Sequence, residues 1–432
     1  MHTSAILADP LPTLAGWADD RLPIRPFGPG RYLVSGDDLV RTALASTTRP
    51  FEAKAATFGA VADWVPGSDR SRPVNAALGR ELDRAWQAVP DDAIRAELAT
   101  SREPWPGALA GVYLRLFGDQ LFPGLPTSPL RDALAASDGL DRAGSALRRF
   151  RGRLAHSRAD AALHRWAAGN DGALPEALRA TLGASDDVAL ALHGLVGAVC
   201  RAASMVAAWT ILLDRGWRPG TPAGTILRPR AGAAPEHPVR DPGDPIGTVL
   251  RPRASAAPER PVREPDDLRL RVGVAPERRV LDPGDPIGTI PRPAEASPAE
   301  HRVREALRLW PVAWQLARTV TEATELGGVD LVPGDRLYLC TYLLHRDPDF
   351  WSEPGEYRPQ RWDRPPEGYK ARYLPYGFGS AACVGSRFVN RVTARVVACS
   401  DALDGLGLQV VDPDPVFGSL LAPPVVRPVP LG

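Results

Sequence analysis

The chain has 432 residues, of which 44% are hydrophobic, enough for a sizeable core in a globular protein as long as a large one-domain enzyme. Its 52 Lys and Arg side chains nearly balance 51 Asp and Glu side chains, and the net charge of +1 argues against a nucleic-acid partner. The four cysteines, Cys200, Cys340, Cys383 and Cys399, form no CxxC pair and no zinc-like spacing with the seven histidines, which argues against a disulfide framework or a structural zinc site and favours a reducing cytoplasm.

The pattern along the chain predicts mainly helices before residue 218. The first twenty residues lack a basic segment followed by an apolar core, and no uncharged apolar run is long enough to span a bilayer. We therefore expect a soluble protein with no membrane partner. A short strand is predicted at residues 31–36, and amphipathic segments such as residues 73–89 and 108–122 predict helices.

An imperfect repeat interrupts this pattern between residues 218 and 298. The segment holds 17 of the 46 prolines, and similar sequences begin at Gly224, at Gly247 and, as a partial copy, at Ala275. Proline removes backbone donors and is disfavoured inside helices, and the repeat is too polar and too short for a solenoid core. We interpret it as an extended surface insertion in one domain of residues 1–432. It is either a tolerated internal duplication or an arm that docks a partner or covers the active site.

Regular structure is predicted again after the insertion. Residues 299–310 have helical spacing, and Glu305 and Arg308 lie three residues apart, close enough to pair on one face. Short strands are predicted within residues 317–340, and an apolar helical pattern follows at residues 388–406.

One cysteine stands in an unusual loop, residues 373–388, with the sequence YLPYGFGSAACVGSRF. A cysteine that binds iron must be a thiolate, which backbone N–H groups and the N-terminus of a following helix stabilise. Gly379 and Gly385 flank Cys383 where close backbone approach to a flat macrocycle requires residues without side chains, and Tyr376 can cover the face of such a ligand. Taken alone, the loop is equally compatible with an ordinary buried cysteine.

Three motifs, in this order and spacing, resemble the cytochrome P450 family. They are the pair Glu305 and Arg308, an aromatic and arginine-containing segment that includes Arg361, and the cysteine loop. Residues 25–36 then correspond to the first strand, and residues 186–216 to the long central helix over the distal face of the haem. The resemblance covers most of the chain. It implies a mainly α (α+β) P450 fold with small β-sheets, haem b (iron protoporphyrin IX), and Glu305, Arg308 and Arg361 as a structural network behind the haem.

The resemblance also implies roles around the haem. Cys383 becomes the proximal iron ligand. Arg318 falls where many family members place an arginine on a haem propionate, although it also fits a solvated surface charge. Arg70 or Arg72 offers a further propionate contact. Ala381 stands where the family usually has Arg or His, so one haem anchor is missing.

The central helix departs further from the family pattern. Typical members carry an acid followed by a threonine that guide protons to the distal face. Aligned on Trp209, these positions fall on Arg201 and Ala202; in an alternative register they fall on Val199 and Cys200. No register restores the pair, and a guanidinium, with a pKa above ~12, cannot exchange a proton near neutral pH.

Three functional hypotheses follow from the resemblance. The first is a haem-thiolate oxidoreductase that hydroxylates or otherwise oxidises a small natural-product intermediate, with the substrate supplying the proton path and a ferredoxin-type donor supplying electrons. The second is a P450-like enzyme that uses peroxide or an activated N–O or O–O substrate, with Arg201 holding an anionic group. The third is a catalytically silent module that binds a partner through the proline-rich arm, against which the retained Cys383 argues.

Overall fold

A computed structural model describes residues 10–46, 49–53, 72–141, 146–183, 185–229, 296–379, 382–418 and 420–431. The repeats at residues 230–295 lie outside these ranges, so the insertion stays a prediction. Arg70 and Ala381 also lie outside the described residues.

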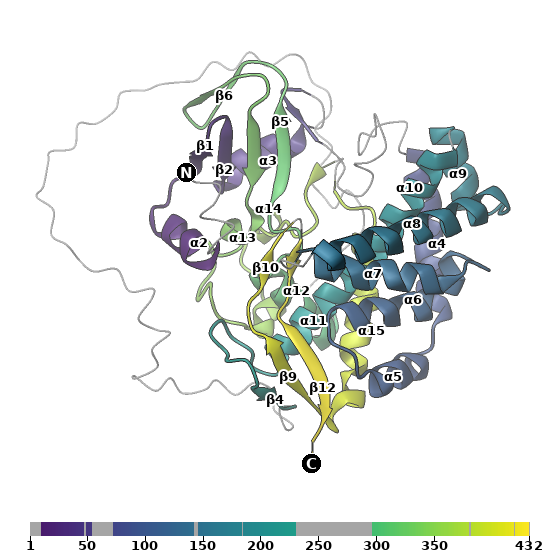
Figure 1. The fold of residues 1–432 in the computed structure, drawn as a ribbon. Coiled ribbons are helices and arrows are strands. Elements are labelled where there is room, and N and C mark those ends of the chain that lie inside the picture. Colours follow the sequence, from purple (N-terminus) through teal and green to yellow (C-terminus); the bar gives the residue numbers. More distant parts are fainter. Residues whose placement is uncertain are drawn as a thin grey trace, which may run out of the picture. The chain divides into compact units, whose positions relative to one another are not determined.

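The mainly helical fold class predicted from the sequence is confirmed (Figure 1). The described helices are α2 (Pro10–Asp19), α3 (Asp37–Ala45), α4 (Arg72–Ala88), α5 (Asp91–Thr100), α6 (Gly107–Leu121), α7 (Thr127–Asp141), α8 (Ala146–Ala168), α9 (Ala173–Leu182), α10 (Ser185–Val196), α11 (Ala202–Asp214), α12 (Pro298–Leu309), α13 (Thr341–Leu344), α14 (Tyr369–Arg372) and α15 (Ser386–Ala398). A π-helical turn, η1 (Gly197–Arg201), joins α10 to α11, and 3₁₀ turns form at η4 (Pro359–Asp363) and η6 (Cys399–Leu403).

The long helix expected over residues 186–216 is present as α10, η1 and α11 in succession. The π turn η1 lies at its middle, and π turns of this kind frequently occur at functional sites. By length and composition the segment Asp187–Asp214 could cross a membrane, but 78% of its apolar window is buried inside the protein. Such burial is typical of a core helix of a soluble protein.

The described part of the chain also forms four small sheets (Figure 1). The largest has the order β1-β2-β8-β5-β3, in which β2 and β8 run parallel and the other neighbours antiparallel. The second has the order β12-β9-β4, and two hairpins pair β6 with β7 and β10 with β11. The strands are β1 (Ile24–Gly28), β2 (Arg31–Val34), β3 (Phe51–Glu52), β4 (Ile226–Leu227), β5 (Leu316–Val320), β6 (Thr324–Leu326), β7 (Val329–Leu331), β8 (Arg336–Leu339), β9 (Leu406–Asp412), β10 (Val416–Phe417), β11 (Leu421–Ala422) and β12 (Val425–Pro430).

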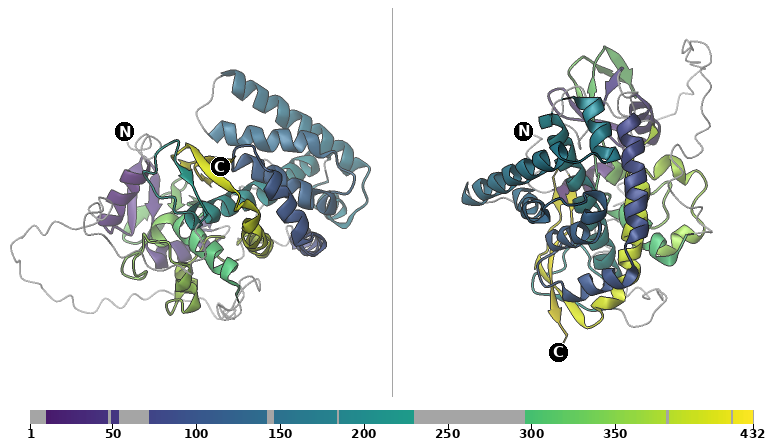
Figure 2. Two further views of the ribbon diagram at one scale, coloured as in Figure 1. Left: turned by 90° about the horizontal axis from the view of Figure 1, so that it is seen from below. Right: turned by 90° about the vertical axis from the view of Figure 1, so that its right-hand side faces the viewer.

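The main core forms where α11, α12 and α15 pack against one another, with α6 and α4 alongside (Figure 2). Trp209 of α11 is fully buried and stacks on Trp310, with ring centroids 4.5 Å apart. Helix α12 begins sharply because Pro298 occupies its first turn and Ser297 forms a capping box with Glu300. This fixed start places Glu305 and Arg308 on the buried side of α12.

Candidate functional site

The cysteine loop is a compact turn between α14 and α15. The Cys383 N–H donates to the carbonyl of Tyr376 at 2.9 Å, and the Ala382 N–H donates to the carbonyl of Gly379 at 3.1 Å. Gly379 has φ +67°, a left-handed conformation that favours glycine. Gly385 caps α15, and a Cβ placed there would lie 3.8 Å from the Cys383 sulfur. The backbone conformation therefore favours glycine at position 379, whereas at Gly385 a Cβ would make only an ordinary contact with the sulfur.

Cys383 is the exposed member of the four cysteines, whereas Cys200, Cys340 and Cys399 are buried. Although the residue as a whole is exposed, loop and helix atoms crowd its sulfur, and this burial raises the pKa of the Cys383 thiol. The backbone N–H groups of Gly385 and Ser386 lower the same pKa because they donate to the sulfur at the start of α15. The loop thus aims backbone donors at the sulfur of an exposed cysteine.

Tyr376 lies partly buried between this loop and α15. Its hydroxyl donates to Oδ1 of Asn390 at 2.8 Å, and burial raises its pKa, so the phenol stays a protonated donor. The bond fixes the Tyr376 ring next to the thiol-bearing turn.

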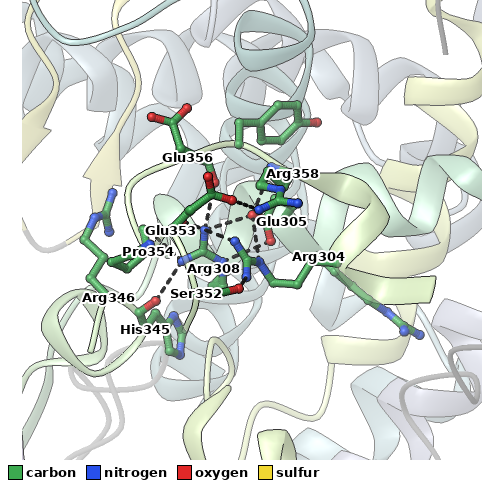
Figure 3. A network of polar contacts seen from close by, with 12 residues as sticks. Arg304, Glu305, Arg308, His345, Arg346, Ser352, Glu353, Pro354, Glu356 and Arg358 are labelled. Carbon is green, nitrogen blue, oxygen red and sulfur yellow. Dashed lines mark hydrogen bonds and ion pairs between the residues drawn. The ribbon is translucent and has the colours of Figure 1, made fainter. Parts of the chain in front are cut away.

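Glu305 and Arg308 form a fully buried ion pair in which two guanidinium nitrogens contact the two carboxylate oxygens, at 2.8 and 3.0 Å (Figure 3). The remaining N–H groups of Arg308 donate to the carbonyls of His345, Pro354 and Glu356, at 2.8–3.0 Å. A single guanidinium therefore joins α12 to the backbone of the segment before the cysteine loop.

The Glu305 carboxylate accepts further bonds from the same segment (Figure 3). Arg361 Nε lies 3.4 Å from it, the Arg358 N–H 3.1 Å, and the Trp362 indole N–H 3.0 Å. Arg361 also donates to Ser352 and to the Glu353 carbonyl. The structure thus brings together the three residues that the resemblance grouped as a network, Glu305, Arg308 and Arg361, and adds Trp362, which the sequence reasoning did not single out.

His345 links this network to the cysteine loop. Its carbonyl accepts from Arg308, and its Nε2 accepts from the backbone N–H of Leu374, at 2.8 Å. The side chain is completely buried, and this burial, followed by the charges of Arg308 and Arg346, lowers the pKa of His345 to about 3. The imidazole is therefore neutral at physiological pH, and its position after α13 gave no signal in the sequence.

Arg318 of β5 is buried, with 6% of its surface exposed, rather than a solvated surface charge. Its Nε donates to the carbonyl of Ala43 and its Nη1 to the carbonyl of Ala317. Among the described residues no carboxylate pairs with it, and burial lowers its pKa to about 10. A buried guanidinium that lacks a counter-charge calls for an anion from outside the described protein atoms.

The remaining predicted residues lie apart from this arrangement. Arg72 is the first residue of α4 and is exposed. Arg201 ends the π turn, and Ala202 begins α11. Arg201 lines a cavity of about 560 Å³ whose lining includes no described residue of the cysteine loop. In the alternative register Val199 and Cys200 are buried, and burial raises the pKa of Cys200 to about 12.

The family comparison matches the part of the chain that holds the buried network and the whole cysteine loop. The model of the family Cytochrome P450 matches residues 299–391. The chain is 46% identical over 86 residues to cyclooctatin synthase of Streptomyces melanosporofaciens, which covers 19% of each protein. It is 41% identical over 85 residues to cytochrome P450 3A5 of Homo sapiens, covering 19% of this chain and 17% of that one. The matched segments thus span about a fifth of the length of these curated relatives.

Solved structures match the chain nearly end to end. A mutant of P450 EryK in complex with erythromycin B has a TM-score of 0.60 at 16% identity, covering 97% of both chains. P450BioI in complex with an acyl carrier protein ligated with hexadec-9Z-enoic acid has a TM-score of 0.61 at 12% identity, covering 99% of both chains. The described residues therefore have the fold of a cytochrome P450.

The resemblance inferred from the sequence is confirmed: residues 299–391, which hold the buried Glu305–Arg308 pair, match the cytochrome P450 family, and the described residues have the fold of a cytochrome P450. That family implies a haem, and the residues present fit one. Cys383 is an exposed cysteine that offers a sulfur donor, and Arg318 offers a buried cation with which no carboxylate among the described residues pairs.

Proposed function

We propose that the protein is a haem-thiolate oxidoreductase. The observation that carries the proposal is the Cys383 turn, where the sulfur of an exposed cysteine receives N–H groups from the start of α15 while the other three cysteines are buried. A bound haem would supply the one-electron and oxygen chemistry. The chain supplies the ligand, the anchoring charges and a rigid support for the loop.

Residues of the cysteine loop and of β5 would each contribute to haem binding. Cys383 would hold haem iron as a thiolate, because metal binding displaces the thiol proton. Gly379 and Gly385 let the loop approach, Tyr376 fixes its side next to α15, and Arg318 would hold a propionate of haem b.

For the substrate we propose a small natural-product intermediate, hydroxylated or oxidised in a related way, with a ferredoxin-type protein as electron donor. The similarity to cyclooctatin synthase supports this class. On α11 the buried Ser204 hydroxyl donates to the Arg201 carbonyl at 2.8 Å, so it is already committed inside the helix. We propose that a substrate hydroxyl or ordered water delivers protons where Arg201 and Ala202 replace the usual acid and alcohol.

Replacing the ligand tests the proposal directly. We expect the native protein, reduced and treated with carbon monoxide, to absorb at the wavelength typical of a thiolate-ligated haem, and Cys383→Ser to lose this band and all turnover. Cys399→Ser, which changes a buried cysteine directly after α15, is the control and should keep the band. A native protein that never shows the band, or a Cys383→Ser protein that retains it, would refute the assignment.

The Arg318→Met variant distinguishes a role of Arg318 in haem binding from a purely structural role. Removing one charge-assisted contact should weaken haem retention about ten- to hundredfold. The same change removes a buried cation that pairs with no carboxylate among the described residues, but also two hydrogen bonds to the carbonyls of Ala43 and Ala317, so the urea concentration at which the haem-free protein unfolds should change little. Haem transfer to apomyoglobin and urea unfolding measure the two effects, with the exposed Arg336→Met on the neighbouring strand β8 as control. Lower stability with normal haem retention would show that Arg318 is only structural.

A further inference from the structure

Helix α8 is strongly basic. Its 23 residues include six arginines and a single acidic residue, Asp160. The Asp160 carboxylate is hydrogen-bonded to the ring of His193 on α10, so it is used at the contact between these two helices. Arginines on an exposed helix usually pair with acidic residues three or four positions away, and no arginine of α8 lies at that distance from Asp160. The positive charge of α8 is therefore not compensated within the helix.

Two rows of residues run along one side of α8, each with a spacing of seven residues. The first row is arginine, and the second, three residues further along, is aliphatic; the rows are Arg151, Arg158 and Arg165, and Leu154, Ala161 and Ala168. All six residues are exposed. Positions three and four apart lie on one helix face, so the two rows form a single stripe, which we call the α8 stripe. Alternating steps of three and four residues are typical of the contact line of a coiled coil.

The other side of α8 faces the core. The helix packs against α7 and α10, and Ala159 and Leu163 are fully buried there (Figure 1). On the α8 stripe, in contrast, Leu154 keeps 42% of its surface exposed, and Phe150, one turn before it, keeps 57%. None of the three arginines of the stripe forms an ion pair with a residue that the structure describes. The stripe thus combines exposed cations with an exposed apolar row.

The arginine row decides which kind of partner fits. A second copy of α8 would place arginine against arginine, and like charges repel. A membrane surface suits a helix whose cations and apolar residues lie on different faces, whereas here both rows share one face. An acidic helix would give each arginine a carboxylate, which its planar fork matches, and would cover the aliphatic row at the same time. Charge complementarity therefore favours an acidic helix.

We propose that the α8 stripe is a docking surface for an acidic α-helix of a partner protein. Carboxylates at seven-residue spacing on that helix lie on the arginine row, and its aliphatic side chains pack on Leu154 and over the small residue Ala161. With a rise of about 1.5 Å per residue, the contact from Arg151 to Ala168 extends about 26 Å. α8 carries none of the residues assigned to the haem-thiolate function, so this inference goes beyond that function and does not rest on it.

Fluorescence anisotropy of a labelled peptide, titrated with the full chain, tests the surface. The probe is a helical peptide of about four heptads that repeats glutamate and leucine at the spacing of the α8 stripe. A peptide of the same composition in shuffled order is its control. We expect the ordered peptide to bind at least about tenfold more tightly than the shuffled one. Added salt should weaken this binding, because exposed charges are screened.

Three variants test where the peptide binds. Arg158→Glu reverses a charge in the middle of the α8 stripe and should weaken binding of the ordered peptide at least about tenfold. Arg153→Glu is the matched control, because Arg153 is exposed on the same helix but lies outside the stripe, and its effect should be far smaller. Ala161→Trp leaves the charge unchanged but adds bulk to the stripe, and it should abolish binding. The circular dichroism of all three variants should match the native protein, since the altered residues are exposed.

Sedimentation with vesicles of phosphatidylserine and phosphatidylcholine tests a membrane surface as the alternative, and we expect no vesicle binding. Vesicle binding that Arg158→Glu abolishes, without a preference for the ordered peptide, would assign the stripe to a membrane and overturn the proposal. So would equal affinity for the two peptides, equal weakening by Arg153→Glu and Arg158→Glu, normal affinity in Ala161→Trp, or no binding of the ordered peptide at all.

Discussion

Glu305→Ala should yield protein that is destabilised by about 3–5 kcal/mol and that accumulates little haem. The change leaves the guanidinium of Arg308 fully buried without its counter-charge, and it also removes the acceptor of the Trp362 indole and of the Arg358 N–H. Those donors hold the segment that leads to the cysteine loop, so the loss should spread to haem binding. Urea unfolding followed by circular dichroism, together with the haem to protein ratio, measures both effects.

Glu300→Ala is the matched control for this prediction. Glu300 lies on the same helix, but among the described residues its carboxylate accepts only from the Ser297 N–H in the capping box at the start of α12. Its loss should cost about 0.3–1 kcal/mol and leave haem content normal. Native stability of Glu305→Ala, or an equal loss in both variants, would contradict a special role for the buried pair.

The buried network around Glu305 shows which contacts can be predicted from the sequence and which cannot. Glu305 and Arg308 can be paired from their spacing alone, because residues three apart lie on one helix face. Arg361 could be joined to them only through the family resemblance, since 53 residues separate it from Arg308 in sequence. The other Arg308 partners, the carbonyls of His345, Pro354 and Glu356, are backbone atoms, and any residue type at those positions would provide them.

Other features depended on packing that no local pattern encodes. The sequence favoured a thiolate turn at Cys383, and the N–H groups of Gly385 and Ser386 are aimed as a helix start requires. The strand pattern could not decide between a haem contact and a solvated surface charge for Arg318, because a short strand does not reveal what covers it; the structure buries this residue. Likewise the π turn ending at Arg201 arises inside a continuous apolar helix, and it turns that residue to a cavity outside the cysteine loop.

His345 should make the protein's stability depend on pH in the mildly acidic range. Its pKa is about 3 in the folded protein, because burial and the charges of Arg308 and Arg346 oppose protonation, whereas an unfolded histidine titrates near ~6.5. The unfolded chain therefore binds the extra proton between these values. The contribution of His345 is fully present above pH ~6.5 and falls by about 1.4 kcal/mol per pH unit as pH drops toward 3.

His345→Gln isolates this effect, because glutamine offers an amide oxygen to the Leu374 N–H but does not titrate. Between pH 7 and pH 5 the native protein should lose about 2 kcal/mol more free energy of unfolding than the variant. Urea unfolding at the two pH values gives the difference, and His164→Gln on α8 controls for the removal of any histidine. Parallel loss of stability in the native protein and His345→Gln would show that His345 does not carry the acid sensitivity.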